Sequence, residues 1–309
     1  MKLATIIAAV GLALASVLSA APAQALNTRS FVSGHGSDAA ACTLAAPCRT
    51  LAAAFAVTSA GGEIDVLDPG GYGALTITRS ISIQGHGFSG ISAASGNAIT
   101  INAGVDDQIN LRGLLIDGLD SGGNGIIVTG VGSLDIQDSL IRRFTNDGLL
   151  FKPGNSSKLS VSHTIISGTV AGIEISPTSN AAAVNVVLEQ VELYDGRSDA
   201  VLVTANSSDG GNQPIQVTVS NSVIANNSNG ILCNSISGIQ KVSCMVRNST
   251  IANNGTGVNA PNTNNFIVLS RTMITGSLIA WTGNVFSYGD NQIDFNLSGN
   301  TAPAQIPQR

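Results

Sequence analysis

Apolar and polar positions along this chain repeat with a period of about 25 residues. Five repeats contain a unit that reads apolar, polar, turn residue, Ser or Thr, variable, apolar, as in 136–141 and 246–251, while 188–193 fits it more loosely and 111–116 opens the series. We call the third position of this unit the turn column. Its successive spacings along the chain are 25, 25, 27, 31, 27 and 23. The members are Gly113, Asp138, His163, Gln190, Asn221, Asn248 and Arg271.

A second column of residues repeats with nearly the same spacing as the turn column. Small residues open short stretches of alternating apolar residues, and their spacings of 23, 24, 28, 30 and 27 change together with those of the turn column. Two columns that drift together indicate one repeated unit whose length varies only in its loops. The members of this glycine column are Gly125, Gly148, Gly172, Ala200, Gly230 and Gly257.

The period predicts an all-β solenoid. Each repeat holds about three short strands and lacks the 3.6-residue apolar period of a helix. Such strands cannot bury a core alone, so successive repeats must stack and form long parallel sheets. We therefore predict a parallel β-helix of about eight to ten coils. A propeller needs longer, four-stranded repeats, and the Leu pattern of leucine-rich repeats is missing. Asp138, Asn221 and Asn248 then have structural roles as corner residues.

The two ends of the repeat region are predicted to differ from its middle. Residues 50–59 have a helical pattern, with Thr50 as N-cap and Gly61-Gly62 as the stop. We expect residues 26–70 to cap the solenoid, residues 71–295 to form its coils in the single domain 26–295, and residues 296–309 to be a flexible tail.

Residues 1–25 have the features of a signal peptide. Lys2 precedes an uncharged apolar run that ends near Pro22, and Ala23-Gln24-Ala25 has the form of a cleavage site. An uncleaved membrane anchor is the alternative, since the run approaches spanning length. We expect cleavage, no further membrane span, and a secreted or periplasmic location.

Export agrees with the four cysteines. We expect two structural disulfides between sequence neighbours, Cys42 with Cys48 and Cys233 with Cys244. A zinc site is the rival interpretation, but it usually needs His partners, and the three histidines do not cluster with the cysteines. We therefore expect no metal at these cysteines.

Composition narrows the function classes. With 43% hydrophobic residues and a net charge of −5, the chain is not disordered. Fourteen basic residues against 19 acidic ones form no cationic stripe, so we expect no nucleic-acid partner. Nothing in the sequence indicates an oligomer, and we expect a monomer.

The N-terminal stretch carries a family resemblance. Residues 31–34, Asp38, Cys42, 47–50 and 61–70 look like the cap of secreted bacterial right-handed parallel β-helix repeat proteins of the pectate-lyase-like superfamily. The resemblance extends over most of residues 28–295 and implies a right-handed helix and export. It implies activity only weakly, because this fold hosts lyases, hydrolases, esterases, epimerases and adhesins. In such folds the strand after the glycine column usually lines a carbohydrate groove. The residues that flank it here are Asn124, Asp147, Lys152, Glu174, Asp199, Asn229 and Asn259.

One cluster of carboxylates could support lyase chemistry. Asp147, Glu174 and Asp199 lie on consecutive coils and could fall within about 10 Å of one another at ~4.8 Å per coil. A pectate-lyase-like site would use them to hold Ca²⁺ and would need Arg or Lys as the base. Arg142, Arg143, Lys152 and Arg197 are near in sequence, but the family's calcium and catalytic-arginine signatures are missing.

Other catalytic patterns are incomplete. The Gly-His-Gly triplets at 34–36 and 85–87 lie upstream of the groove coils, where a polygalacturonase-like hydrolase would have them after its Asp motifs. Gln137 and Asp138 lack the second pair that a methylesterase-like site needs, and His163 occupies the turn column. These patterns favour no enzyme.

Two hypotheses remain open. The first is an exported, non-catalytic β-helix scaffold that needs no cofactor and binds polysaccharide or cell-envelope components along a polar, Asn-rich groove through Asn124, Lys152, Asn229 and Asn259. Trp281 is the only Trp, so sugar stacking would be weak. The alternative is a lyase or hydrolase of acidic, pectin-like polysaccharide, with Asp147, Glu174 and Asp199 as catalytic residues and Ca²⁺ in the lyase case.

Overall fold

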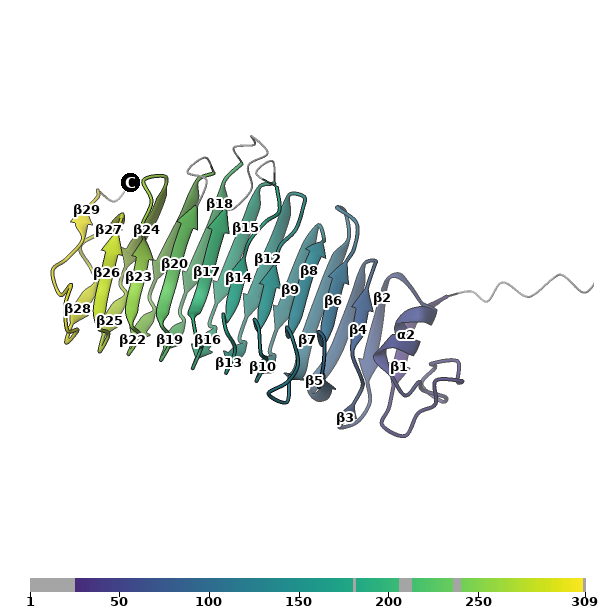
Figure 1. Cartoon of the computed structure of the whole chain (residues 1–309). Coiled ribbons are helices and arrows are strands. Elements are labelled where there is room, and N and C mark those ends of the chain that lie inside the picture. Colours follow the sequence, from purple (N-terminus) through teal and green to yellow (C-terminus); the bar gives the residue numbers. More distant parts are fainter. Residues whose placement is uncertain (1–25, 180–181, 206–212, 236–239, 308–309) are drawn as a thin grey trace, which may run out of the picture.

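The chain forms a right-handed parallel β-helix, seen as an elongated stack of coils in Figure 1. The computed structural model describes residues 26–179, 182–205, 213–235 and 240–307. The predicted signal peptide, residues 1–25, lies outside them. No helix in this described part has the length and apolar character that a membrane span requires.

One long sheet runs down the stack, and we call it sheet 1. Its nine strands are all parallel, a number within the predicted range of coils. In spatial order they are β4 (Leu75–Ile77), β6 (Ile99–Asn102), β8 (Ile126–Gly130), β11 (Leu149–Phe151), β14 (Ile173–Ile175), β17 (Asp199–Ala205), β20 (Asn229–Ser235), β23 (Thr256–Ala260) and β26 (Ile279–Gly283).

Sheet 2 follows sheet 1 within each coil. Its strands also pair in parallel from one coil to the next, in the order in which they occur along the chain. They are β1 (Asn27–Val32), β2 (Thr58–Val66), the first parts of β5 (Ile81–Ser92) and β7 (Gln108–Asp117), β9 (Ser133–Gln137), β12 (Ser157–Ser162), β15 (Val184–Glu189), β18 (Ile215–Ser220), β21 (Val242–Arg247), β24 (Asn265–Ser270), β27 (Val285–Ser287) and β29 (Ala304–Gln305).

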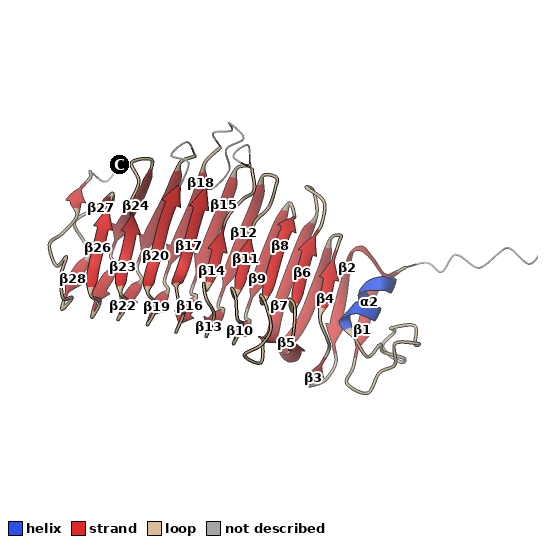
Figure 2. Ribbon diagram, in the orientation of Figure 1, coloured by secondary structure: helices blue, strands red, loops and turns tan. Residues whose placement is uncertain are grey.

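Sheet 3 completes each coil before the chain returns to sheet 1. It joins sheet 2 through β5 and β7, which continue around the corner between the two faces. Figure 2 shows that strands make up nearly the whole stack. Besides the second parts of β5 and β7, sheet 3 holds β3 (Gly70–Gly71), β10 (Leu140–Arg142), β13 (Ile165–Ser167), β16 (Glu192–Tyr194), β19 (Val223–Ala225), β22 (Thr250–Ala252), β25 (Met273–Thr275) and β28 (Gln292–Asp294).

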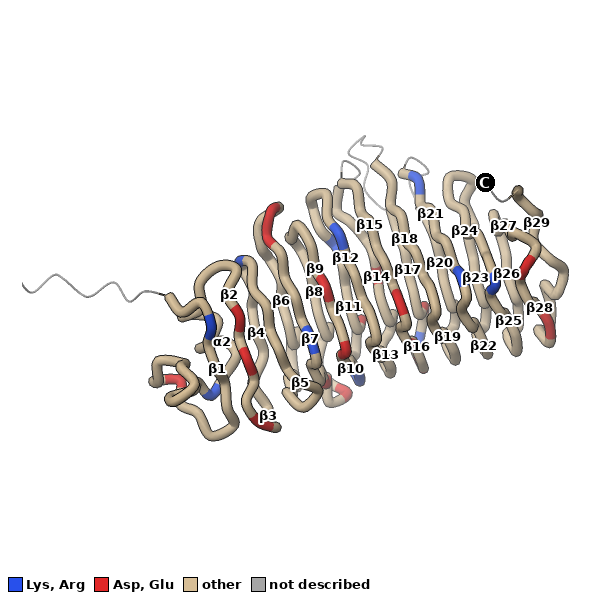
Figure 3. Tube along the Cα trace, turned by 180° about the vertical axis from the view of Figure 1, so that it is seen from behind, with Lys and Arg blue, Asp and Glu red and all other residues tan. Residues whose placement is uncertain are grey.

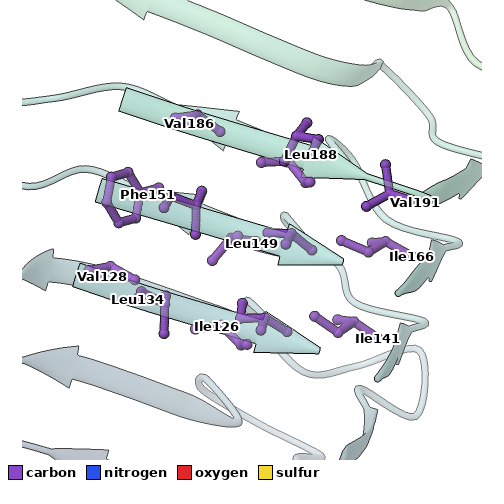
Figure 4. Close-up of a cluster of buried hydrophobic side chains, with 14 of the residues drawn as sticks. Ile126, Val128, Leu134, Ile141, Leu149, Phe151, Ile166, Val186, Leu188 and Val191 are labelled. Atoms are coloured by element: carbon purple, nitrogen blue, oxygen red, sulfur yellow. The ribbon is translucent and has the colours of Figure 1, made fainter. Parts of the chain in front are cut away.

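The core consists of aliphatic ladders that run along the stack. Ile126, Leu149, Ile173 and Val201 pair in register on successive strands of sheet 1, and each is 0% exposed. Figure 4 shows this stacking for Ile126 and Leu149, with Ile141 and Ile166 of sheet 3 beside them. Because each side chain is covered by its equivalents above and below, a coil acquires its core only from its neighbours.

The turn column is confirmed as the corner between sheets 2 and 3. All seven predicted members have positive φ, between 44° and 65°, the left-handed region that Gly and Asn adopt with least strain.

A second corner of the same kind, which we did not predict, joins sheet 3 to sheet 1. Its members come five positions after members of the turn column, and their φ values lie between 55° and 67°. This constant offset is the signal that could have revealed the corner. The members are Arg143, Gly168, Asp195, Asn226, Asn253 and Gly276.

Buried hydroxyls connect the coils at the first corner. Ser249 is 4% exposed; its Oγ donates to the Arg247 carbonyl (2.8 Å) and accepts from the backbone N–H of Ser222 (3.2 Å) on the preceding coil. Ser222 Oγ likewise accepts from the Val191 N–H (3.2 Å). These bonds satisfy polar groups that would otherwise be buried without partners, which explains the Ser or Thr that follows five of the seven turn residues.

The N-terminal cap contains the helix α2 (Leu51–Val57) at one end of the stack (Figure 1). Thr50 is its N-cap as predicted, since its Oγ1 accepts from the Ala53 N–H (3.2 Å). The predicted stop at Gly61-Gly62 is wrong. The helix ends at Thr58, whose hydroxyl donates to the Ala54 carbonyl (2.6 Å) and whose extended backbone begins β2, which includes both glycines.

Both predicted disulfides are formed. Cys42 pairs with Cys48 inside the cap, and Cys233 of β20 pairs with Cys244 of β21. The second disulfide joins sheet 1 to sheet 2 across a segment in which residues 236–239 are not described.

Residues 296–307, for which we predicted a flexible tail, contact the last coil through backbone hydrogen bonds. The backbone N–H groups of Leu297 and Ser298 donate to the carbonyls of Ser277 (2.9 Å) and Leu278 (3.0 Å), and β29 pairs with β27. The edge of the last coil carries unpaired backbone groups, and this segment satisfies part of them.

We predict that Ser249→Ala lowers the free energy of unfolding by about 1–2 kcal/mol, because the Ser222 N–H and Arg247 carbonyl each lose a buried partner. Urea unfolding measures this change. Ser160→Ala is the control, since Ser160 lies at an outward position of β12, and it should change the free energy by less than about 0.5 kcal/mol. Equal effects of the two substitutions would contradict a stabilising role for the buried hydroxyls.

Candidate functional site

Two rows of residues along sheet 1 contain the predicted site. The ladder row comes two positions before the first core residue of each strand. The outward row follows one position after that core residue, where side chains face away from the core. The ladder row is Asn97, Asn124, Asp147, Ala171, Asp199, Asn229 and Thr256, and the outward row is Ile127, Leu150, Glu174, Leu202, Leu232, Asn259 and Thr282.

The first part of the ladder row is a chain of side-chain hydrogen bonds between coils. Asn124 Nδ2 donates to Asn97 Oδ1 (2.9 Å), and Asn124 Oδ1 accepts from the Asp147 N–H (3.2 Å). Asp147 Oδ1 in turn accepts from the Ala171 N–H (3.1 Å). Asn124 and Asp147 are each 8% exposed. Both predicted site residues therefore hold neighbouring coils together.

The carboxyl of Asp147 has an unusual electrostatic environment. Burial raises its pKa, the hydrogen bond from the Ala171 N–H opposes this, and the negative charge of Glu174 adds to the rise, so that the pKa reaches about 6. A residue with such a pKa exchanges its proton near neutral pH. The group is held in an internal ladder, in a position that Asn occupies on the preceding coils.

Asp199 is also held by its neighbours. It is 4% exposed; Oδ1 accepts from Asn229 Nδ2 (2.7 Å) and Oδ2 accepts from Ser198 Oγ (2.9 Å). Ala171 separates it from Asp147 in the ladder row, so the two aspartates are two coils, or roughly 10 Å, apart.

Glu174 belongs to the other row. It sits in the middle of β14, half-buried, between Leu150 and Leu202 of the adjacent strands. The three predicted catalytic carboxylates thus share a sheet, but two are bonded inside the ladder and one faces outward. The part of the chain that the structure describes holds no group of three or more His, Cys, Asp or Glu side chains that could bind a metal ion. These carboxylates do not fit a calcium site, which requires six to eight converging oxygen atoms.

Three of the four basic residues that we considered as a catalytic base form hydrogen bonds to protein groups other than the candidate carboxylates. Arg142 and Arg143 both donate to Asp117, at 3.0 Å and 2.6 Å, and form an ion-pair cluster at the end of β7. The Arg197 guanidinium donates to the carbonyls of Phe144 (3.0 Å) and Thr145 (2.9 Å). These contacts hold corners of the coils in place.

Lys152 and Asn259 remain on the exposed face. Lys152 directly follows β11, and Asn259 lies in the outward row between Leu232 and Thr282. The Asn259 side chain is half-buried, and its Oδ1 atom is buried without a hydrogen-bond partner among the described residues. Four of the seven residues of the outward row are aliphatic and only one is Asn, so this row is less rich in Asn than the groove that we expected.

The histidines lie away from these carboxylates. His163 is at a corner with φ 47°, and His86 lies in the turn of β5, stacked on Phe88 with 5.8 Å between ring centres. His35 Nδ1 lies 3.5 Å from Asp68 Oδ2 in the cap. Each Gly-His-Gly triplet therefore belongs to a turn outside the coils that carry Asp147 and Glu174.

One signal could have separated the two rows beforehand. Asn124, Asp147, Asp199 and Asn229 each directly precede a member of the glycine column. A residue that keeps the period of a structural column is expected to serve the stacking of coils. Glu174 does not keep this period, and it is the carboxylate that faces outward.

We predict that Asp147→Asn stabilises the protein above pH about 6 and not at pH about 4. The folded-state pKa lies above the ordinary value of 3.8, so the stabilisation from the protonated carboxyl is complete below that value and is lost as pH rises through about 6. Asn keeps the acceptor for the Ala171 N–H without a charge. Thermal unfolding across this pH range measures the difference.

Asp147→Ala is the matched control for this prediction. It removes the acceptor and should destabilise the protein at both pH values, since the Ala171 N–H loses its partner. A lower unfolding temperature for Asp147→Asn than for the natural protein at pH about 8 would contradict the argument.

Comparison with known proteins supports the fold. No protein-family model matches the sequence, and no curated protein matches it either. The structure of pectate lyase Pel9A is similar with a TM-score of 0.66 at 14% identity, covering 91% of this chain and 78% of the lyase. The Dettilon tailspike protein is more distant, with a TM-score of 0.47 at 14% identity, covering 79% of this chain and 58% of the tailspike. The A-module of the Azotobacter vinelandii mannuronan C-5 epimerase AlgE6 has a TM-score of 0.32 at 13% identity, covering 81% of this chain and 92% of the module. This chain has the parallel β-helix fold of pectate lyase Pel9A.

Proposed function

We propose that this protein is an extracytoplasmic scaffold that binds polysaccharide along the outer face of sheet 1 and does not cleave it. One observation carries the proposal: Asp147 and Asp199, the acids best placed for chemistry, are bonded within the ladder row. A catalytic acid or base must reach substrate. These two carboxylates instead connect coils.

The similar fold of a pectate lyase and the polar residues on the outer face of sheet 1 support polysaccharide binding there. Pectate lyase Pel9A, which shares the fold, is named for its action on a polysaccharide. The contact residues that we propose are Lys152, Glu174, Asn229 and Asn259, which carry a cation, a carboxylate and two amides on four coils. Asn124 is not among them, because both ends of its side-chain amide are bonded in the ladder row.

The location outside the cytoplasm rests on two features. Residues 1–25 have the form of a signal peptide, and both disulfides are of the kind that persists in oxidising compartments. We propose a monomer that needs no cofactor, since the scaffold function requires only an exposed face.

We predict binding of at least one polysaccharide in a panel of acidic and neutral glycans, with no unsaturated products and no new reducing ends, with or without added Ca²⁺. Lys152→Gln should weaken binding several-fold, because it removes the cation beside the outward row. The control, Lys158→Gln, removes an exposed cation from sheet 2 and should leave binding unchanged. Failure to bind any glycan would contradict the proposal.

A second function has one specific observation in its favour. The raised pKa of Asp147 beside the charge of Glu174 gives a proton donor near a carboxylate, the pair that a glycoside hydrolase uses. If this function holds, reducing ends form with a bell-shaped pH dependence, and Asp147→Asn and Glu174→Gln each abolish the activity. Activity that survives both substitutions would exclude it.

A further inference from the structure

A cleft of about 550 Å³ opens on the outer face of sheet 2, toward the C-terminal end of the stack. It lies away from the residues discussed on sheet 1, and none of the predicted site residues lines it. Its lining comes from four successive coils: Thr218, Met245, Arg247, Ser270, Arg271, Tyr288 and Asp290.

Strand register brings these residues together. Thr218 of β18 pairs with Met245 of β21, and Arg247 at the end of β21 pairs with Ser270 at the end of β24. Arg271 follows at the corner, so the two arginines come from adjacent coils. Tyr288 is placed by its backbone N–H, which donates to the Leu269 carbonyl (3.1 Å).

The two guanidinium groups in the cleft differ from the others. Within the described part of the chain, seven arginines donate to a carboxylate or a backbone carbonyl, whereas Arg247 and Arg271 form no side-chain hydrogen bond or ion pair, and both are exposed. Two guanidinium groups whose N–H donors have no partner among the described residues thus line the same cleft. Figure 3 shows how sparse charged residues are elsewhere along the stack.

One carboxylate lies in the cleft with them. Asp290 Oδ2 accepts from Ser270 Oγ (2.9 Å), and the carboxylate also accepts from the Arg271 backbone N–H. Burial raises the pKa of Asp290, but these hydrogen bonds and the charge of Arg271 outweigh it, so the pKa lies below its ordinary value. Asp290 is therefore ionised at neutral pH and can accept hydrogen bonds from a ligand.

Glu189, two coils before Arg247, is the other nearby acid. Its carboxylate already accepts from the Ser220 hydroxyl and the Asn221 amide, and the charge of Arg247 contributes to lowering its pKa. Glu189 is not among the residues that line the cleft. The cleft itself carries two positive charges and one negative charge.

This combination selects a ligand chemistry. Guanidinium groups bind oxyanions in a forked, two-point geometry. Tyr288 and Met245 offer apolar surface for the flat face of a sugar ring, while Asp290, Thr218 and Ser270 offer partners for hydroxyl groups. The Asp290 charge disfavours a doubly charged group such as a phosphate monoester.

We propose that this cleft binds a sugar residue bearing a singly charged oxyanion, a carboxylate or a sulfate ester, with Arg247 and Arg271 on the anion and Asp290 on ring hydroxyls. The inference rests on the proposed function in taking the ligand to be a saccharide. The inference adds a second saccharide site, on sheet 2, and this second site is the one that binds the carboxylate or sulfate ester of the sugar.

The neighbouring coils supply substitutions that the fold accepts. Arg271 occupies the turn column, where the two preceding coils have Asn221 and Asn248, and Asn adopts its φ of 44° more readily than Arg. Arg247 lies in register between Ser220 and Ser270. The double variant Arg247→Ser with Arg271→Asn therefore removes both guanidiniums and leaves residues that already occur at these positions.

A matched control removes two charges from the same sheet elsewhere. Arg112 lies in register between Gln84 and Gln137, and its charge is already paired with Asp138 (2.8 Å). Lys158 lies next to Asn185 in register. The control variant is Arg112→Gln with Lys158→Asn.

Isothermal titration of the full chain with trigalacturonate, a singly sulfated neutral trisaccharide and its unsulfated counterpart tests the inference. We expect the natural protein to bind one or both charged probes at least tenfold more tightly than the uncharged one. The Arg247→Ser/Arg271→Asn variant should lose at least tenfold in affinity for the charged probe, and Tyr288→Ala several-fold. Tyr288→Phe and the control variant should stay within twofold.

The outcomes separate the two proposals. Charged probes that bind the double variant as tightly as the natural protein overturn the cleft and leave the proposed function standing. The cleft inference is also overturned, and the proposed function is kept, if only Lys152→Gln weakens binding or if the uncharged probe binds most tightly. If no saccharide binds, the proposed function fails and the cleft inference fails with it.

Discussion

Hydrogen bonding between successive coils is the constraint on which this structure depends. A coil of three short strands has no partner within itself, so its backbone groups pair with the coils before and after it. The coils approach one another closely where each coil enters sheet 1, at the glycine column. A Cβ atom on Gly148 would lie 2.7 Å from the Gly172 carbonyl oxygen and 2.3 Å from a methyl of Ile166, which explains why the glycine column admits only small residues.

The same constraint determines what the polar residues do. Buried hydroxyls such as that of Ser249 accept an N–H from one coil and donate to a carbonyl of their own. Asn124 and Asp147 perform the equivalent task on the other side of the coil. A carboxylate in such a ladder connects coils, and its position in the sequence resembles that of a catalytic residue only because it borders the groove strand.

Much of the fold could be predicted from the sequence because it repeats. The corner residues of the turn column, the stacked aliphatic positions and both disulfides follow from column spacing and from the oxidising environment that the predicted signal peptide implies. The direction of individual side chains follows from column spacing only for residues that keep the period of the glycine column. Asp147 lies two positions before the core residue Leu149 and is bonded within the ladder. Glu174 directly follows the core residue Ile173, and the regular alternation of β14 turns it outward.

The cleft on sheet 2 could not be predicted from the sequence, for a different reason. Arg247, Arg271, Tyr288 and Asp290 are far apart in the chain and share no motif, and only the strand register unites them. One hint was present in the sequence: Arg271 stands in a column where the two preceding coils have Asn. Departures from a structural repeat are where a solenoid can present specific chemistry, since the repeat itself is needed for stacking.

A crystal structure of the protein with a bound oligosaccharide tests most directly whether the ladder carboxylates are structural. The account predicts an uncut saccharide on the outer faces of the sheets, with the Asp147 carboxyl still accepting from the Ala171 N–H and Asp199 still bonded to Asn229. A glycosidic oxygen within hydrogen-bonding distance of Asp147, or a cleaved saccharide beside Asp147 and Glu174, would contradict it.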